Sequence, residues 1–303
     1  MANNRISKAK RVHILAALSE GTPINAVCRM VSVNKRSVLR VIEETGEALF
    51  AYMSDTFRDL PCERVAMDEQ WQYVGKHGQR MMTKERDRGD FWLWAAIDSD
   101  TKLVFSFLIG RRDWQASEDF VRDASKRVRG PIQIATDPQR SYAPHIRAYF
   151  QQPGVSHGID TKVFHDASEF RPELFPAKRK NGIPKIAKSE REAVTGNPNL
   201  ATLTTSHIER FFLTMRQEVT RFTRMTLGYS KDLRMHKLAT ALHIGLYNLV
   251  RKHSSLDGRT PAQAACVEDK RWDLGDVVEL TERHMKAKED AKFEAAFAEL
   301  EKP

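Results

Sequence analysis

The hydrophobic pattern changes its period near residue 60, and this change limits the folds that the chain can adopt. Residues 7–48 carry apolar side chains at the three- and four-residue spacing of helices, which predicts three short helices. From residue 63 onward the apolar residues come in short runs of strand length. We therefore expect an all-helical domain over residues 1–50, a linker helix over residues 51–62, and a second domain built on a β-sheet.

Five segments of the second domain have the length and composition of strands, and they cover residues 63–75, 90–98, 103–110, 132–137 and 161–166. The first three strands follow one another directly, whereas the last two alternate with amphipathic helices over residues 117–128 and 141–150. This order predicts an α/β fold with a mixed five-stranded sheet covered by helices on both faces.

Helices dominate the rest of the chain. An amphipathic helix begins after Thr205, and further helical patterns cover residues 233–253 and 278–301. We expect the sheet domain to span residues 63–256, followed by a helical tail over residues 257–303. Residues 168–204 fit neither period, are rich in proline and glycine, and are interpreted as a basic insertion.

Basic residues are concentrated in two segments. Residues 1–41 hold eight Lys or Arg and one acid, and residues 171–192 hold seven Lys or Arg and three acids, in a chain of net charge +9. Clustered cations favour a nucleic-acid partner, because a phosphate backbone that binds them releases its counterions. A solvated surface is an equal alternative for the second segment.

The first basic segment has the pattern of a helix-turn-helix: two short helices, a tight turn and a third helix that starts with polar and basic residues. In that interpretation the third helix enters the major groove of double-stranded DNA. It would present Asn34, Lys35, Arg36, Ser37 and Arg40 to bases and phosphates. The alternative is an ordinary three-helix bundle at the edge of a domain.

Three acids stand at positions where strands or helices can bring them together. Asp68 lies within the first strand, Asp137 ends the fourth strand, and Glu209 lies in the first turn of the helix after the sheet. An acid inside an apolar strand is costly unless a cation balances it. Three carboxylates would select Mg²⁺ or Mn²⁺, and two such ions support the displacement of a phosphodiester.

Other readings of these acids remain open. Asp98 and Asp100 compete for the role of first ligand, although their setting also suits a hairpin turn. Glu209 stands three residues after Ser206, so the two could simply form a capping box.

The remaining features exclude some classes of protein. No stretch approaches the roughly 18 apolar residues that a membrane span needs, and the basic start of the chain is not followed by the apolar segment of a signal peptide. The three cysteines lie far apart and make no metal-binding or disulfide pattern. We expect a cytoplasmic protein without a membrane partner.

Several short motifs resemble those of the RNase H-like DDE transposases of bacterial insertion sequences. The segments that carry the resemblance are Met67–Trp71, Ala96–Thr101, Ala135–Asp137, Ser206–Phe211, Leu246–Leu256 and Gly258–Ala264. Together they extend over roughly residues 60–265, and they are specific only as a set.

The resemblance implies an RNase H-like domain in which Asp68, Asp137 and Glu209 bind two Mg²⁺ or Mn²⁺ ions. It implies cleavage of DNA at the ends of an insertion sequence, transfer of those ends to target DNA, a homodimer on DNA, and a location at the bacterial nucleoid. The residues that would contact DNA outside the helix-turn-helix are Arg210, Arg216, Lys178, Arg179 and Lys180. His207 would flank the same site.

One feature departs from the family pattern. The 71 residues between Asp137 and Glu209 exceed the usual spacing, and Glu190 or Glu192 would replace Glu209 if the insertion displaced the last helix.

Two other functions remain possible: a non-catalytic helix-turn-helix regulator derived from a transposase, and an RNase H-like nuclease that does not join ends. The presence of all three acids favours an enzyme over the regulator, and the helix-turn-helix favours a transposase that binds element ends over the nuclease.

Overall fold

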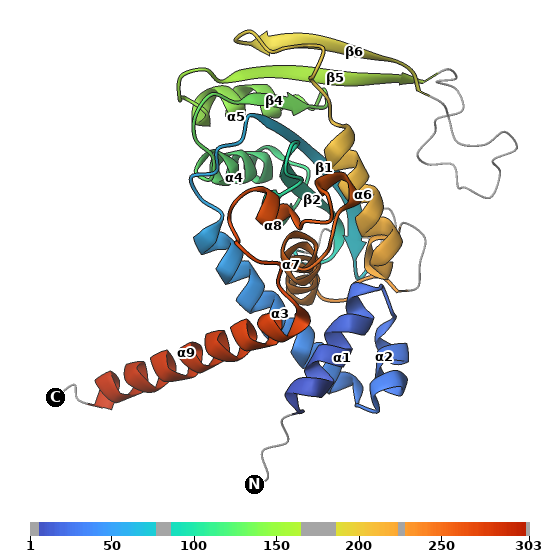
Figure 1. Cartoon of the computed structure of the whole chain (residues 1–303), viewed down its shortest axis with the longest axis vertical. Coiled ribbons are helices and arrows are strands. Elements are labelled where there is room, and N and C mark those ends of the chain that lie inside the picture. The colour runs from blue at the N-terminus through green and yellow to red at the C-terminus, as the bar shows by residue number, and fades with distance from the viewer. Residues whose placement is uncertain (1–5, 77–85, 165–185, 224–227, 301–303) are drawn as a thin grey trace, which may run out of the picture.

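The chain folds into one mixed sheet covered by helices, with the amino-terminal helices packed at one end (Figure 1). The computed structural model describes residues 6–76, 86–164, 186–223 and 228–300. In these ranges no helix is both long enough and apolar enough to cross a membrane.

The sheet has six strands in the order β3-β2-β1-β4-β5-β6. Their bounds are β1 Arg64–Val74, β2 Gly89–Asp98, β3 Val104–Gly110, β4 Gln133–Thr136, β5 Ser156–Phe164 and β6 Ile186–Thr195. Strands β1, β4 and β5 run parallel, whereas β2 and β3 on one side and β6 on the other are antiparallel to their neighbours. This mixed α/β arrangement is consistent with an RNase H-like fold.

The expectation of five strands is wrong, because β6 lies inside the segment interpreted as an insertion. This strand pairs with β5 at the edge of the sheet, and its Lys188, Glu190 and Glu192 are exposed. Edge strands commonly carry such charges. The strand therefore lacks the apolar alternation by which the other five were predicted.

The helices are α1 Lys8–Ser19, α2 Ile24–Val31, α3 Lys35–Thr56, α4 Trp114–Ser125, α5 Tyr142–Tyr149, α6 Ser206–Glu218, α7 Leu233–Leu249, α8 Pro261–Ala264 and α9 Leu274–Leu300. Five of them follow a residue whose side chain accepts a backbone N–H of the first turn, namely Ser7, Asn34, Asp113, Asp232 and Thr260. Such caps satisfy donors that the helix leaves unpaired.

Helix α3 is a single helix of 22 residues, so the separate linker helix expected over residues 51–62 is the second half of α3. The apolar stripe runs through both halves, and the buried residues include Val41, Leu49 and Met53. No proline interrupts it. The continuous stripe keeps one helical face against the core and prevents a break.

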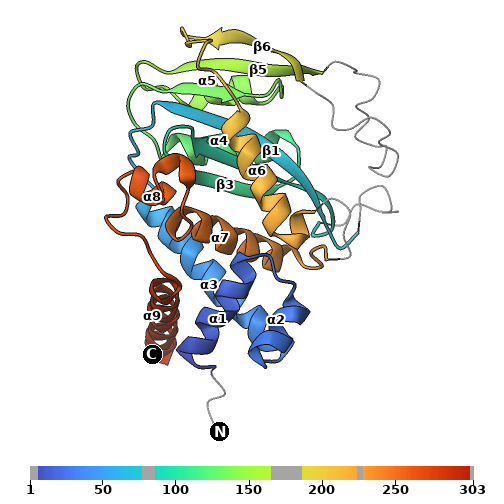
Figure 2. The ribbon, with the colours of Figure 1, turned by 45° about the vertical axis from the view of Figure 1, so that its right-hand side comes forward.

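Helices cover both faces of the sheet and one of its edges. Rings of α4 and α5 pack on Trp94 of β2, where Phe120 and Tyr142 lie 6.0 Å and 5.8 Å from it between centroids. Helix α6 crosses β1 on the other face (Figure 2). At the β3 edge, the Asn248 amide of α7 accepts the Val104 N–H at 3.0 Å and donates to the Val104 carbonyl at 2.8 Å. These two hydrogen bonds satisfy the backbone N–H and carbonyl of Val104, which lie at the unpaired edge of the sheet.

The contact between α3 and α7 is close because both helices place a glycine there. A Cβ added to Gly46 would lie 2.2 Å from the backbone oxygen of Leu238, and one added to Gly245 would lie 2.8 Å from the nearest side-chain carbon of Leu49. The first neighbour is rigid backbone, whereas the second is a side chain that can rotate.

We predict that Gly46→Ala lowers the free energy of unfolding by about 1–3 kcal/mol, the range for overpacking of a core, despite alanine's better helix propensity. Gly245→Ala should cost clearly less. Urea unfolding followed by circular dichroism measures both. Equal losses, or a gain for Gly46→Ala, would contradict the close approach of the two helices.

Candidate functional site

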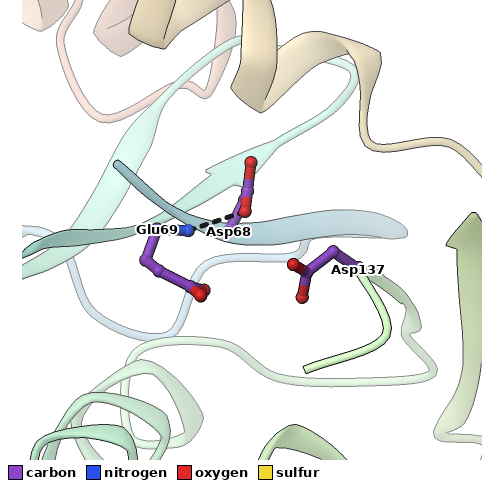
Figure 3. Close-up of side chains that lie close together, drawn as sticks. All are labelled: Asp68, Glu69 and Asp137. Atoms are coloured by element: carbon purple, nitrogen blue, oxygen red, sulfur yellow. Dashed lines mark hydrogen bonds between the residues drawn. The ribbon is translucent and has the colours of Figure 1, made fainter. Parts of the chain in front are cut away.

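The parallel pairing of β1 with β4 places two acids side by side. The paired stretch ends with Met67 opposite Thr136, and the next residue on each strand is Asp68 or Asp137. One oxygen each of Asp68, Asp137 and Glu69 lies within 4.8 Å of the others. Figure 3 shows Asp68 on one side of β1, Glu69 on the other side, and Asp137 beside the strand.

Asp68 and Asp137 each retain an oxygen that could bind a cation. Oδ1 of Asp68 accepts the Glu69 N–H at 2.8 Å, and Oδ1 of Asp137 accepts the Gln139 N–H at 3.0 Å. Within the described part of the chain, neither carboxylate has an ion-pair partner or a bond to its second oxygen. Neighbouring carboxylate oxygens that make no other bond are suitable ligands for Mg²⁺ or Mn²⁺.

Glu209 approaches the same place from the first turn of α6. Its negative charge contributes to raising the pKa of both Asp68 and Asp137, although its oxygens lie outside the 4.8 Å group. Its Oε1 accepts the Thr205 hydroxyl at 2.8 Å and also pairs with the Lys162 ammonium of β5. The structure therefore brings Glu209 near the two aspartates and gives it a cationic partner of its own.

The expected capping box at the start of α6 is wrong. The residue before the helix is Thr205, not Ser206, and its backbone N–H is accepted by Asp160 Oδ2 at 3.1 Å. Asp160 is 3% exposed and belongs to β5. Because a strand residue anchors the helix, the Glu209 carboxylate remains available for other partners.

Glu69 was not predicted, because strand alternation places it on the face opposite Asp68. Its side chain is 2% exposed and is held by Arg112 Nη2 at 2.7 Å, Arg112 Nε at 2.8 Å and the Tyr142 hydroxyl at 2.9 Å. A second acid inside a largely buried strand was the sequence signal that could have found it. Glu69 is an alternative third ligand whose oxygens already have donors.

The electrostatics of the cluster disfavour negative charge in the absence of a cation. Burial raises the pKa of Asp68 well above its ordinary value, and the charges of Asp137, Glu69 and Glu209 add to the rise. Burial also raises the pKa of Asp137, although the Gln139 N–H and the Arg112 cation oppose it. A bound divalent cation would remove this penalty.

The rival acids have other roles. Asp98 accepts the Asp100 N–H at 2.9 Å and the Thr101 hydroxyl at 2.6 Å, so it shapes the turn between β2 and β3. Asp100 pairs with Arg64. The two glutamates of β6, Glu190 and Glu192, lie on the far side of β4 and β5 from β1. The structure does not bring any of the four to the carboxylate cluster.

The residues predicted to contact DNA occupy separate surfaces. Near the start of α3, Lys35, Arg36 and Arg40 are exposed and Ser37 is half-buried. Asn34 is exposed, but its Oδ1 accepts the Ser37 N–H at 2.9 Å as the cap of the helix.

The other predicted contacts are divided between α6 and a segment that is not described. Arg210 is exposed directly after Glu209, whereas Arg216 is half-buried and already has a partner. His207 lies 3.2 Å from the Lys102 ammonium, and burial followed by that cation lowers its pKa. Lys178, Arg179 and Lys180 lie outside the described residues.

Comparison with known proteins identifies no family: no family model matches the sequence, and no curated protein matches it. Among solved structures, the chain is similar to the piggyBac transposase of a synaptic complex with hairpin DNA, at 14% identity and a TM-score of 0.38, over 93% of this chain and 72% of that one.

Two Mos1 structures are also similar. The strand transfer complex has 15% identity and a TM-score of 0.21, over 52% of this chain and 59% of that one. The pre-cleavage transpososome has 13% identity and a TM-score of 0.18, over 50% and 59%.

We predict that Asp68→Asn stabilises the metal-free protein. A raised carboxyl pKa means that folding stability falls as the pH rises from the ordinary value to the raised one, and asparagine carries no such charge. At neutral pH with EDTA, the melting temperature should increase by about 2–4 °C for each kcal/mol gained in the free energy of unfolding. The difference should disappear at a pH below the ordinary value.

The same variant should respond less to metal. Mn²⁺ should raise the melting temperature of the native chain through binding to the folded state, and this rise should shrink in Asp68→Asn. Asp119→Asn, which changes a half-buried acid paired with Arg122 on α4, is the matched control. A full Mn²⁺ response in Asp68→Asn would argue against a metal site at Asp68.

Proposed function

We propose that this chain is a metal-dependent transposase that cleaves DNA at the ends of an insertion sequence and transfers those ends to target DNA. The observation that carries the proposal is the convergence of Asp68 and Asp137, which form no ion pair among the described residues, with Glu209 on the facing helix. A structural role for unpaired, largely buried carboxylates would be costly.

Asp68, Asp137 and Glu209 would hold two Mg²⁺ or Mn²⁺ ions. When bound, such ions activate the attacking water or 3′-hydroxyl and stabilise the leaving oxygen of a phosphodiester. Free carboxylate oxygens fit this requirement, and the buried strand β1 gives Asp68 a fixed position.

The neighbouring residues orient the third carboxylate. Asp160 fixes the start of α6 through the Thr205 N–H, and the Thr205 hydroxyl binds Glu209 Oε1. Lys162 pairs with that oxygen in the metal-free protein. Hydrogen bonds from neighbouring residues to a carboxylate set the direction in which it faces a metal ion.

The amino-terminal helices would recognise the DNA ends as a helix-turn-helix. Support comes from the short connection between α2 and α3 and from the exposed cations at the start of α3. We infer that this end of α3 contacts bases and phosphates through Lys35, Arg36, Ser37, Arg40 and the side-chain NH₂ of Asn34. Homodimerisation on DNA, a nucleoid location and the DNA contacts of Arg210, Arg216 and residues 178–180 belong to the same proposal.

The alternatives are a non-catalytic regulator and a nuclease that does not join ends. Intact carboxylates oppose the first. The second differs from a transposase in its products, so the assay below must detect joined as well as cleaved strands.

We predict that Asp137→Asn abolishes cleavage of a plasmid that carries the gene and its flanking DNA, in the presence of Mg²⁺ or Mn²⁺. Primer extension across the element ends detects cleavage, and sequencing of target junctions detects strand transfer. Cleavage at the native rate by Asp137→Asn would sink the proposed catalytic site.

A paired comparison identifies the third ligand. We predict that Glu209→Gln removes detectable cleavage, whereas Glu69→Gln reduces it by about 10–100-fold, the usual cost of a lost outer-shell partner. Glu69 already has Arg112 and Tyr142 as donors. The reverse order of the two losses would assign the third ligand to Glu69.

For end recognition, we predict that the double variant Arg36→Ala, Arg40→Ala binds DNA more weakly and with a shallower salt dependence. Loss of two phosphate contacts should lower the slope of log Kd against log salt by about 2. Fluorescence anisotropy measures the slope, and Arg122→Ala on α4 is the control. A slope equal to that of the native chain would remove α3 as the DNA-contacting helix.

A further inference from the structure

Arg221 is a cation that no carboxylate of the described residues neutralises. It lies on the short 3₁₀ helix Thr220–Phe222 that follows α6, and its side chain is half-buried. Its Nη1 donates to Ser230 Oγ at 3.1 Å. Across the ranges that the structure describes, this hydroxyl is its one hydrogen-bond partner, and no carboxylate forms an ion pair with it.

The groups around Arg221 are neutral. Ser230 Oγ lies 2.7 Å from Nδ1 of the fully buried His236, whose ring packs on Phe222. Burial, followed by the charge of Arg221, lowers the pKa of His236 to about 3 and that of His243 to about 3. Burial lowers the pKa of Arg221 itself to about 10, so the guanidinium stays charged at neutral pH.

Another buried arginine shows what compensation looks like in this fold. Arg127 is 8% exposed, and it binds both oxygens of Asp123 at 2.7 Å and 2.9 Å. It also donates to the carbonyl groups of Met53 and Phe57. A half-buried cation without such partners destabilises the free protein and is suited to an external anion.

The position of Arg221 connects the two functional regions. The Thr220 hydroxyl lies 3.5 Å from the Gly21 carbonyl oxygen in the corner between α1 and α2. A Cβ on Gly21 would lie 2.2 Å from the backbone oxygen of Glu218, so the corner packs directly on the end of α6. At 1.5 Å per residue, about 14 Å of helix separates Glu218 from Glu209.

We propose that Arg221 and Ser230 form a binding site for a backbone phosphate of double-stranded DNA, between the amino-terminal helices and the carboxylate cluster. The site rests on the proposed function, since it needs DNA that reaches from one region to the other. The Arg221 guanidinium donates one hydrogen bond, to the Ser230 hydroxyl, so its other N–H groups can donate to a phosphate. The Ser230 hydroxyl is a second polar group at the same place.

The free protein should show the cost of keeping this site. Arg221→Met retains much of the side-chain volume and removes the charge, so it should raise the melting temperature without DNA. It should also bind DNA more weakly. A purely structural arginine would give the opposite change in stability and leave DNA binding intact.

The experiment measures anisotropy of a fluorescent 30-base-pair duplex of arbitrary sequence, in EDTA, over a series of salt concentrations. For Arg221→Met we expect about tenfold weaker binding at low salt and a slope about 1 unit shallower, as for one lost phosphate contact. Arg221→Lys should keep the native slope, because it keeps the charge. Arg122→Met, which removes an arginine paired with Asp119 on α4, should also keep it.

The outcomes separate this site from the function as a whole. A native slope in Arg221→Met overturns the site while DNA binding by the native chain stands. Stabilisation by inorganic phosphate that requires Arg221, with an unchanged DNA slope, overturns the DNA assignment in favour of a free anion. A native chain that binds no DNA overturns the proposed function as well. If Arg221→Met does not fold, Arg221→Gln takes its place: a slope about 1 unit shallower than that of the native chain supports the phosphate contact, and a native slope overturns it.

Discussion

The parallel pairing of β1 with β4 determines where the chemistry of this chain can occur. The two strands are joined through β2, β3 and α4, and their register ends where each continues into an aspartate. A shift of one residue would turn Asp68 to the opposite face of the sheet. Helix α6 packs on β1 from one face, and on the other face the Tyr142 hydroxyl of α5 donates to Glu69 of β1.

The four carboxylates of the site differ in whether they form an ion pair. The two outer carboxylates, Glu69 and Glu209, each have a cation, Arg112 and Lys162 respectively. The two central ones, Asp68 and Asp137, form no ion pair in the described chain, and burial raises the pKa of both. Such an arrangement keeps the outer groups ordered and leaves the central oxygens for a divalent ion.

Sequence reasoning predicted the parts of the structure that carry a strong apolar period. The first four strands lie close to their expected bounds, because buried alternation is a local signal, whereas β5 begins at Ser156, five residues before its expected start. It missed β6, whose charged residues face solvent at the sheet edge. It also divided α3 in two near residue 50, although the buried stripe continues through that point.

The site was predictable to the extent that strand ends determine it. Asp68 and Asp137 lie together as expected, because β4 ends beside the middle of β1, where Met67 pairs with Thr136. The presence of Glu69 in the cluster and the anchoring of Thr205 by Asp160 depend on contacts between distant segments. No sequence period encodes such contacts, so only the folded chain reveals them.

The unbroken helix α3 has a consequence for the geometry of cutting. Its amino-terminal end carries the exposed cations, while its second half is buried against α7, over a length of about 33 Å at 1.5 Å per residue. A rod embedded at one end cannot swing independently at the other. The spacing between the exposed cations at its tip and the carboxylates on β1 is therefore fixed. Under the proposed function, that spacing would set how many base pairs lie between the recognised sequence and the cut.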